Sequence, residues 1–274
     1  MVKNKSVPRK ESNNIGMTGG NPFKNDPRFR LELSYNLVLP KTRSFLDYGC
    51  SDGKLLIALK KKIPKAKIYG FDVDAEKTRY IKRNFPGIKI VASSHKSRLI
   101  LKNSTQEVVA LLDVLEHVPD EKMVLSDIYR VLKPGGVLIL SVPHKGLTEV
   151  FDAGNVKFRF PGLHRFLYER VFGKKDYVKN YLGKELVGDV TWQESMWHKH
   201  YSLTELKKLF RTKFKIEKVY YFGLFFPLLS MLDQAIEWFF KKKNLLGKMV
   251  IADSRTNYGN LSFSILIIAR KAGR

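Results

Sequence analysis

SFLDYGCSDGK, from Ser44 to Lys54, is the stretch of the sequence that decides the fold. Its apolar start predicts a short buried strand that ends at Asp47, and the apolar run after Lys54 predicts a helix. Gly49 and Gly53 lie in the turn between these two elements. Because glycine lets a ligand approach the backbone and a helix start offers unpaired N–H groups, the arrangement predicts a binding notch of nucleotide size.

Two familiar nucleotide-binding patterns do not fit this turn. The dinucleotide pattern G-x-G-x-x-G would need glycine where Ser51 and Lys54 stand, and a P-loop would need Ser or Thr in place of Leu55. The turn instead reads D-x-G-x-S-x-G, with the Asp47 carboxylate two residues before the first glycine. A carboxylate at that point would repel a pyrophosphate, so the turn suits a ligand that carries a cationic group.

Together with three later segments, the turn resembles the class I S-adenosylmethionine-dependent methyltransferases, in the branch whose fourth-strand motif reads LEHV. The later segments follow the order of that family's motifs: IYGFDVD (68–74), DVLEHVPD (113–120) and VLKPGGVLILSVP (131–143). The resemblance extends from Phe45 to Pro143. It implies a Rossmann-like, doubly wound α/β sheet of seven strands with the last strand antiparallel, S-adenosyl-L-methionine as cofactor, and methyl transfer as the reaction.

Apolar periodicity and the positions of Pro and Gly predict alternating strands and helices, which indicate a parallel sheet covered on both faces. Strands are expected at residues 44–47, 66–71, 88–92, 108–112 and 137–142, and two final strands, at 214–222 and 261–269, are expected to pair antiparallel. Helices are expected at residues 27–39, 55–62, 75–84, 121–132 and 202–210. A capping box from Ser202 to Glu205 opens the last of these helices, and the turn Pro134-Gly135-Gly136 is expected to precede strand 137–142.

The chain divides into four expected regions. These are a flexible basic arm at residues 1–26, a cofactor-binding core at 27–143, a substrate cap at 144–200, and the end of the core sheet at 201–274 with an apolar and basic insertion at 223–260. In the methyltransferases that the chain resembles, a helix before the core often covers the cofactor, and residues 27–39 would take that place.

The resemblance assigns cofactor contacts to residues at the ends of the predicted strands. Gly49 and Gly53 would let the backbone approach the cofactor, and Asp47 would lie near its methionyl ammonium. Asp72, at the end of the second strand, would accept hydrogen bonds from both ribose hydroxyls. The alternatives are a helix cap for Asp47 and a solvated loop position for Asp72. The other residues expected at the cofactor are Cys50, Val73, Ser94, Asp113 and Val114.

Ser94 departs from the family pattern. An aspartate commonly reads the adenine amino group after the third strand, where this chain has Ser93-Ser94-His95. A serine hydroxyl could accept the same hydrogen bond.

Histidines are the candidates on the acceptor side. His144 follows the fifth predicted strand, where a neutral imidazole could deprotonate a hydroxyl near pH 7, and His117 is a second candidate base. His198 and His200 are expected to line the substrate pocket with His144. Packing or loop roles are the alternatives for each. No metal site is expected, because no Cys or carboxylate cluster accompanies the last two histidines.

The charge is the unusual feature of the composition. The chain has 50 Lys and Arg against 26 Asp and Glu, a formal net charge of +24. Such a surface attracts polyanions, either nucleic acid or an anionic membrane face, unless it is simply solvated. The single cysteine, Cys50, excludes an internal disulfide and fits a reducing compartment. A cytoplasmic location is expected, with a peripheral position on the inner membrane face as the alternative.

Residues 223–243 hold the most apolar stretch of the chain. Asp233, Glu237 and Pro227 make a membrane-spanning helix a poor fit. An interfacial helix on an anionic membrane fits better, with Trp238 and the lysines at 241–243 at the headgroup level. A helix buried against the domain or a dimer partner is the alternative, and the oligomeric state stays open.

These observations favour O-methylation of a small-molecule, glycan or lipid-linked acceptor. RNA methylation is the alternative that the basic charge supports, although the chain lacks the [DNS]-P-P-[FYW] motif of amino-group methylation and a catalytic cysteine pair. A non-catalytic binding protein on the same fold is disfavoured, because it would not need the intact glycine turn together with Asp72.

Overall fold

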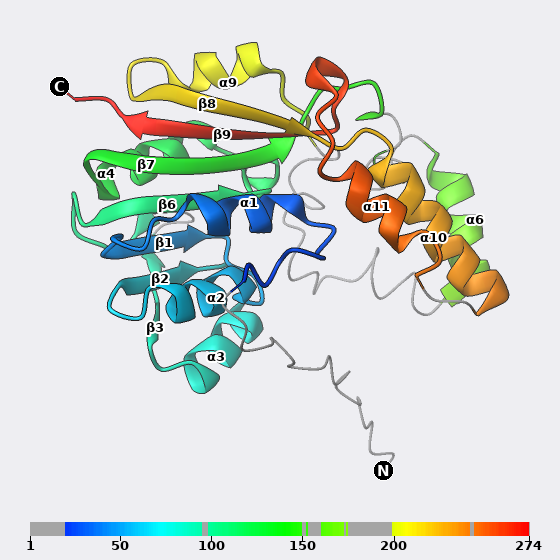
Figure 1. The fold of residues 1–274 in the computed structure, drawn as a ribbon, viewed down its shortest axis with the longest axis horizontal. Coiled ribbons are helices and arrows are strands. Elements are labelled where there is room, and N and C mark those ends of the chain that lie inside the picture. Colours follow the sequence, from blue (N-terminus) through cyan, green and yellow to red (C-terminus); the bar gives the residue numbers. More distant parts are fainter. Residues whose placement is uncertain are drawn as a thin grey trace.

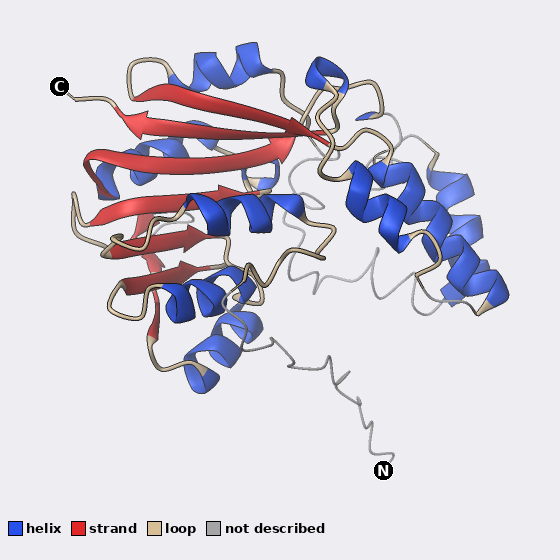
Figure 2. Ribbon diagram, in the orientation of Figure 1, coloured by secondary structure: helices blue, strands red, loops and turns tan. Residues whose placement is uncertain are grey.

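The computed structural model describes residues 20–94, 98–149, 152, 160–172, 174, 199–241 and 244–273. Its centre is a seven-stranded sheet with the strand order β3-β2-β1-β6-β7-β9-β8. Helices cover both faces of this sheet, and a further group of helices lies beyond the ends of the strands (Figure 1, Figure 2). The predicted Rossmann-like α/β fold, with its last strand antiparallel, is confirmed.

The strands of the sheet are β1 (Ser44–Tyr48), β2 (Lys67–Phe71), β3 (Ile88–Ile90), β6 (Gln106–Leu112), β7 (Leu132–Pro143), β8 (Phe214–Phe222) and β9 (Ser264–Lys271). A separate hairpin of β4 (Ser93–Ser94) and β5 (Arg98–Leu99) was not expected. Apart from β7, the expected strands of the sheet lie within a few residues of these bounds.

The helices are α1 (Phe29–Leu37), α2 (Lys54–Lys62), α3 (Ala75–Asn84), α4 (Glu121–Val131), α6 (Pro161–Phe172), α9 (Leu203–Phe210), α10 (Phe226–Phe240) and α11 (Gly247–Asp253), with 3-10 turns η2 (Leu115–His117) and η5 (Gly259–Leu261). The predicted capping box of α9 is confirmed. The Glu205 amide donates to Ser202 Oγ at 3.3 Å, and the Ser202 amide donates to Glu205 Oε2 at 2.8 Å.

Three aspartates are brought to one edge of the sheet by its parallel strands. β1 pairs in parallel with both β2 and β6, and β6 pairs in parallel with β7. The arrowheads of these strands point the same way in Figure 1. Asp47 lies near the end of β1, while Asp72 and Asp113 directly follow β2 and β6. The topology therefore places all three at the carboxyl edge, where ligands of such sheets bind.

Two apolar layers hold the sheet between its helices. Leu46 and Val109 are fully buried in the layer that also includes side chains of α4 and α9. Their sequence neighbours Phe45 and Ala110 are fully buried in the layer on the other face, with side chains of α2. Burial on both faces explains why the strands read as continuous apolar runs rather than as an alternating pattern.

The predicted start of β7 is wrong. The strand begins at Leu132, which pairs with Gln106, and the register shifts before Val137 pairs with Val108. The Pro-Gly-Gly triplet therefore forms an irregularity within the strand, where Gly135 takes a positive φ of 71°. The triplet does follow the end of α4, but the burial of both Leu132 and Gln106 starts the ladder earlier than the apolar run indicates.

The predicted apolar insertion folds as α10 and α11, which lie with α6 beyond the carboxyl ends of the strands (Figure 1). None of the helices in the described part of the chain has the length and apolar character that crossing a bilayer requires. Most of the predicted substrate cap, 144–200, lies outside the described residues, so its role stays a prediction.

Candidate active site

The glycine turn between β1 and α2 folds onto the end of β2. The amides of Gly49 and Cys50 donate to the Phe71 carbonyl at 2.7 and 2.9 Å. Gly49 has φ +87°, and a Cβ atom there would lie 2.2 Å from Cγ2 of Val114. Only glycine fits a left-handed backbone at such close approach. Gly53, directly before α2, also has a left-handed backbone, with φ +74°.

Asp72 connects this turn to the start of α3. Its Oδ2 accepts a hydrogen bond from the Ser51 amide at 2.7 Å, and its Oδ1 accepts one from the Asp74 amide at 2.9 Å. Each carboxylate oxygen has a second lone pair. The carboxylate is thus fixed in orientation and could still accept two hydrogen bonds from a vicinal diol, as the predicted ribose role requires.

Asp47 lies buried beneath the turn. Burial, together with the negative charges of Asp72 and Asp52, raises the pKa of the Asp47 carboxyl to about 7. A cation at this point would stabilise the ionised form and lower that pKa again. The position therefore suits a ligand that carries an ammonium group.

Asp113, at the end of β6, is held by two side chains. Ser141 Oγ donates to its Oδ1 at 2.6 Å, and Arg30 Nε lies 2.8 Å from its Oδ2. The backbone of Asp113 has φ +51°, which is uncommon for a residue with a side chain. Since Arg30 belongs to α1, this ion pair joins α1 to the carboxyl edge of the sheet.

These elements surround a cavity of about 340 Å³. The predicted residues that line it are Asp47, Gly49, Cys50, Asp72, Val73, Asp113, Val114 and His117. Gly53 is not in this lining. The side chain of Ser94 lies outside the described part of the structure, and so does His198. The cavity thus brings together most of the residues that the resemblance assigned to a cofactor.

Cys50 is not activated in this cavity. Burial, followed by the charges of Asp47 and Asp72, raises the pKa of its thiol well above the ordinary value. A thiol that stays protonated is a poor nucleophile. Cys50 therefore stays a predicted cofactor contact within the turn and is not a candidate nucleophile.

His144 and His200 lie together outside the lining of this cavity. Both are buried, and the Nδ1 atom of His144 lies 2.9 Å from the carbonyl oxygen of Ser262. His200 Nε2 lies 3.2 Å from Asp152 Oδ2. Burial, the first cause, and the nearby His200 lower the pKa of His144. Their catalytic and substrate roles stay predictions.

The sequence did not identify three residues at the start of α1 that line the cavity: Arg28, which directly precedes the helix, Arg30 and Leu31. The helix was expected to cover a ligand, but the residues that would do so were not predicted. Arginine in a surface helix usually indicates solvent exposure, and the sequence has no local signal that pairs Arg30 with Asp113.

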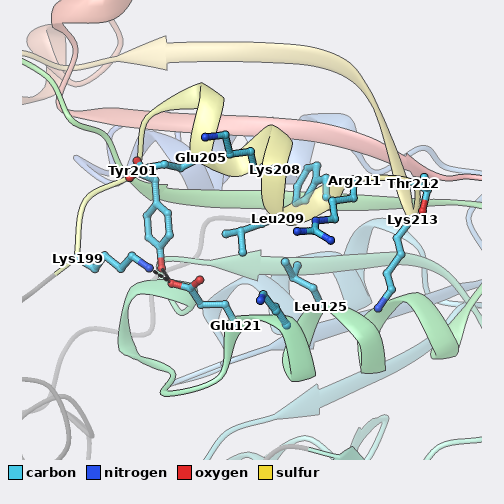
Figure 3. Close-up of a pocket in the computed structure, with 12 residues that line it drawn as sticks. Glu121, Leu125, Lys199, Tyr201, Glu205, Lys208, Leu209, Arg211, Thr212 and Lys213 are labelled. Carbon is cyan, nitrogen blue, oxygen red and sulfur yellow. Dashed lines mark hydrogen bonds and ion pairs between the residues drawn. The ribbon is translucent and has the colours of Figure 1, made fainter.

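A second cavity, of about 430 Å³, lies between α4 and α9 (Figure 3). Its acids are occupied: Lys199 pairs with Glu121, which also accepts a hydrogen bond from the Tyr201 hydroxyl at 2.7 Å. Its basic residues with no ion pair in the described part of the chain are Lys122, Lys208, Arg211 and Lys213. None of its lining residues belongs to a glycine turn or to the carboxyl end of a parallel strand. The first, smaller cavity is therefore the candidate active site.

Comparison with known proteins points to one family. A family profile described as a methyltransferase domain matches residues 25–213. The ubiquinone/menaquinone biosynthesis C-methyltransferase UbiE of Desulfotalea psychrophila is 28% identical over 52% of this chain and 59% of its own length. The demethylmenaquinone methyltransferase of Anoxybacillus flavithermus is 26% identical over 69% of this chain and 76% of its own length.

The matches are partial in length, and the structural likeness concerns the fold alone. The chain spans 39%, 59% and 44% of the first three curated relatives it matches. The solved structure of the [4+2]-cyclase SpnF has a TM-score of 0.52 and 15% identity, over 90% of this chain and 81% of that chain. A neighbour named as a cyclase illustrates that this fold does not by itself specify the reaction.

Proposed function

Because the chain belongs to the class I S-adenosylmethionine-dependent methyltransferases, we propose that it methylates an oxygen atom of a small-molecule, glycan or lipid-linked acceptor. The observation that carries methyl transfer is the cavity in which the buried Asp47, the glycine turn and Asp72 meet. The choice of acceptor is supported by the LEHV motif and by the apolar insertion at 223–260. S-adenosyl-L-methionine, the cofactor of this family, supplies a methyl group bonded to a positively charged sulfur.

The residues of the cavity fit this cofactor. The Asp47 carboxylate would pair with its ammonium group, and the fixed carboxylate of Asp72 would accept hydrogen bonds from its ribose hydroxyls. The absence of a side chain at Gly49 would let the backbone approach it. Helix α1, held in place by the ion pair of Arg30 with Asp113, would exclude water from the cavity. An in-line displacement on a sulfonium requires this exclusion of water.

A general base is needed only if the acceptor must lose a proton. His144 is supported for this role by its lowered pKa, which keeps the imidazole neutral near pH 7. If its Nδ1 donates to the Ser262 carbonyl, Nε2 carries the lone pair of a base. His117 lines the cavity itself and is the second candidate, while His198 and His200 would contact the acceptor.

The acceptor class is tested with radiolabelled S-adenosylmethionine and fractionated extract from the source of the protein. Label in the small-molecule, glycan or lipid fraction is expected, and base-labile or ether-linked label would identify oxygen. A methyl group on carbon would overturn the proposed O-methylation. Methylation of carbon is a specific alternative, because one relative is named as a C-methyltransferase. Asp72→Ala should abolish cofactor binding, and unchanged binding would contradict the site.

Contact with an anionic membrane through residues 223–243 belongs to this proposal. Large apolar side chains of this region are solvent-exposed: Phe225 at 46%, Leu232 at 46% and Phe240 at 70%. Such side chains next to Lys241 suit a lipid surface. Flotation with phosphatidylserine vesicles checks the contact. Failure to float, or flotation that Phe240→Ser with Leu232→Ser leaves intact, would count against it.

RNA is the second candidate acceptor, favoured by the basic cavity between α4 and α9. Figure 3 shows the side chain of Lys213 extending toward α4. Phosphates there would meet cations that lack acidic partners in the described chain, and RNA binding would weaken steeply with salt. Label in the RNA fraction would support this candidate. Protein that carries no RNA after purification, with activity insensitive to salt, would exclude it.

A further inference from the structure

Arg255, just after α11, joins the C-terminal insertion to the segment that leads into α1. Its Nη2 lies 2.6 Å from the carbonyl oxygen of Lys24, 3.1 Å from that of Asp26 and 3.2 Å from that of Phe23, so its two protons are shared among several acceptors. Its Nε and Nη2 also donate to Glu32 Oε2, at 3.0 and 2.5 Å. In Figure 1 this segment and α11 lie side by side, although more than two hundred residues separate them in the chain.

The Arg255 side chain also forms hydrogen bonds with residues of the insertion itself. Nη1 donates to the Ile251 carbonyl at 2.9 Å and to Ser254 Oγ at 3.3 Å, and the guanidinium lies 5.6 Å from the ring centre of Phe29 in α1. The Arg255 side chain is only 22% exposed. A planar guanidinium offers five N–H donors in a fixed fork, and here those donors span two segments of the chain.

Two residues before Arg255, Asp253 fixes the start of α10. Its Oδ2 accepts hydrogen bonds from the amides of Leu224, Phe225 and Phe226, at 3.0, 3.0 and 2.7 Å. Residues 253–255 therefore connect the apolar helix α10, the end of α11 and the segment before α1.

From that segment the contacts continue into the cavity. The Asp26 carboxylate accepts hydrogen bonds from the amide, Nε and Nη2 of Arg28, at 2.8, 2.9 and 2.7 Å. Arg28 lines the cavity, as does Arg30, which forms the ion pair with Asp113. A displacement of Arg255 would thus affect the cavity through residues that are hydrogen-bonded to one another.

We propose that Arg255 is a positioning residue for cofactor binding, through which the α10–α11 insertion holds α1 over the cavity. The inference rests on the proposed assignment of this cavity to the cofactor. By reciprocity, a ligand that moves the insertion would change cofactor affinity by the same factor as the cofactor changes the affinity of that ligand.

The test uses S-adenosylhomocysteine as the probe, titrated calorimetrically into the full chain. We expect Arg255→Gln to weaken binding tenfold or more. Arg255→Lys should be intermediate, because it keeps the charge beside Glu32 but cannot span the carbonyl oxygens of Lys24 and Asp26. Arg270→Gln is the matched control: Arg270 also binds a carboxylate, of Glu217, and a carbonyl oxygen, of Gly135, and it should leave the affinity unchanged.

Hydrogen exchange of residues 21–32 separates positioning from a general loss of stability. In Arg255→Gln these amides should exchange faster than in the wild type, while the amides of β6 and β7 keep their rates. Saturating S-adenosylhomocysteine should restore slow exchange, because the ligand and Arg255 stabilise the same position of α1. Glu32→Gln, which keeps the arginine, should show a smaller change of the same kind and serves if Arg255→Gln does not fold.

The outcomes distinguish this inference from the proposed function. If Arg255→Gln and Glu32→Gln bind like the wild type while Asp72→Ala loses binding, the cavity assignment holds and the inference is wrong. If Asp72→Ala binds normally, the cavity assignment itself fails. Equal losses in Arg255→Gln and Arg270→Gln would also overturn the positioning role.

Discussion

Nε of Arg30 lies 2.8 Å from Oδ2 of Asp113, an ion pair that joins α1 to the carboxyl end of β6 beside the cavity. Both side chains are mostly buried, at 26% and 29% exposed. The pair holds the helix that would cover the cofactor, and it also occupies a carboxylate that Ser141 orients.

We expect Arg30→Gln to weaken S-adenosylhomocysteine binding about fivefold, since a pair of this exposure contributes about 1 kcal/mol. Titration calorimetry measures the change. Asp113→Asn should weaken binding to a similar degree, and the double variant should be little worse than either single one, because the two residues act through one contact. Additive losses would show that they act separately.

Gly49→Ala should destabilise the fold by about 3 kcal/mol or more, because the new Cβ combines left-handed strain with a collision. The collision is with Cγ2 of Val114, at 2.2 Å. Gly135→Ala is the matched control, since Gly135 has φ +71° with no atom within 4 Å of an added Cβ. Strain alone should cost about 1 kcal/mol there. Equal losses of unfolding free energy for the two variants, measured in urea, would mean that the Val114 side chain moves away from the added Cβ.

The cofactor end of the site could be predicted because its signals are local in sequence. The spacing of Asp47 and the glycines, and the position of Asp72 after an apolar run, specify a turn and a strand end without knowledge of distant contacts. Parallel pairing then brings these residues together. This is why the fold agrees with the sequence-based prediction, and why most of the residues predicted to contact the cofactor line one cavity.

The contacts that hold α1 over the cavity could not be predicted, because they are not local in sequence. Arg30 with Asp113, and Arg255 with Glu32, join segments far apart in the chain, and no periodicity encodes which surface arginine meets which carboxylate. His144 shows a related limit. Its place after β7 indicated a candidate base, but not its contact with the Ser262 carbonyl, which follows from the pairing of Pro143 with Ser264 in β9.

Cofactor affinity should depend on pH through Asp47. Its carboxyl has a pKa of about 7 in the protein, raised by burial first and then by Asp72 and Asp52. Binding of an ammonium requires the ionised carboxylate. Above pH 7 the Kd of S-adenosylhomocysteine should therefore be constant, and below it the Kd should rise toward about tenfold per pH unit, as one proton must be released.

Asp47→Asn is the control for this pH dependence. It should bind weakly and with no slope between pH 5.5 and 8, since the titrating group is gone. A wild-type Kd that does not change over this range would contradict the assignment of the ammonium to Asp47.

Asp47→Asn should at the same time stabilise the protein without cofactor. The folded state holds the Asp47 pKa at about 7, above its ordinary 3.8, so folding takes up a proton between these values and this carboxyl lowers stability as pH rises through them. A shift of about three units corresponds to at most about 4 kcal/mol gained by the variant at pH 8, and to about 2 kcal/mol at pH 5. Urea unfolding at the two pH values measures the gain. Asp52→Asn is the comparison. The Asp52 carboxylate is 46% exposed and pairs with Lys54, and its charge is the smallest of the three causes that raise the Asp47 pKa, so its removal should change stability far less than Asp47→Asn does. A gain for Asp47→Asn that is equal at both pH values would mean that the buried carboxyl is not the group that titrates.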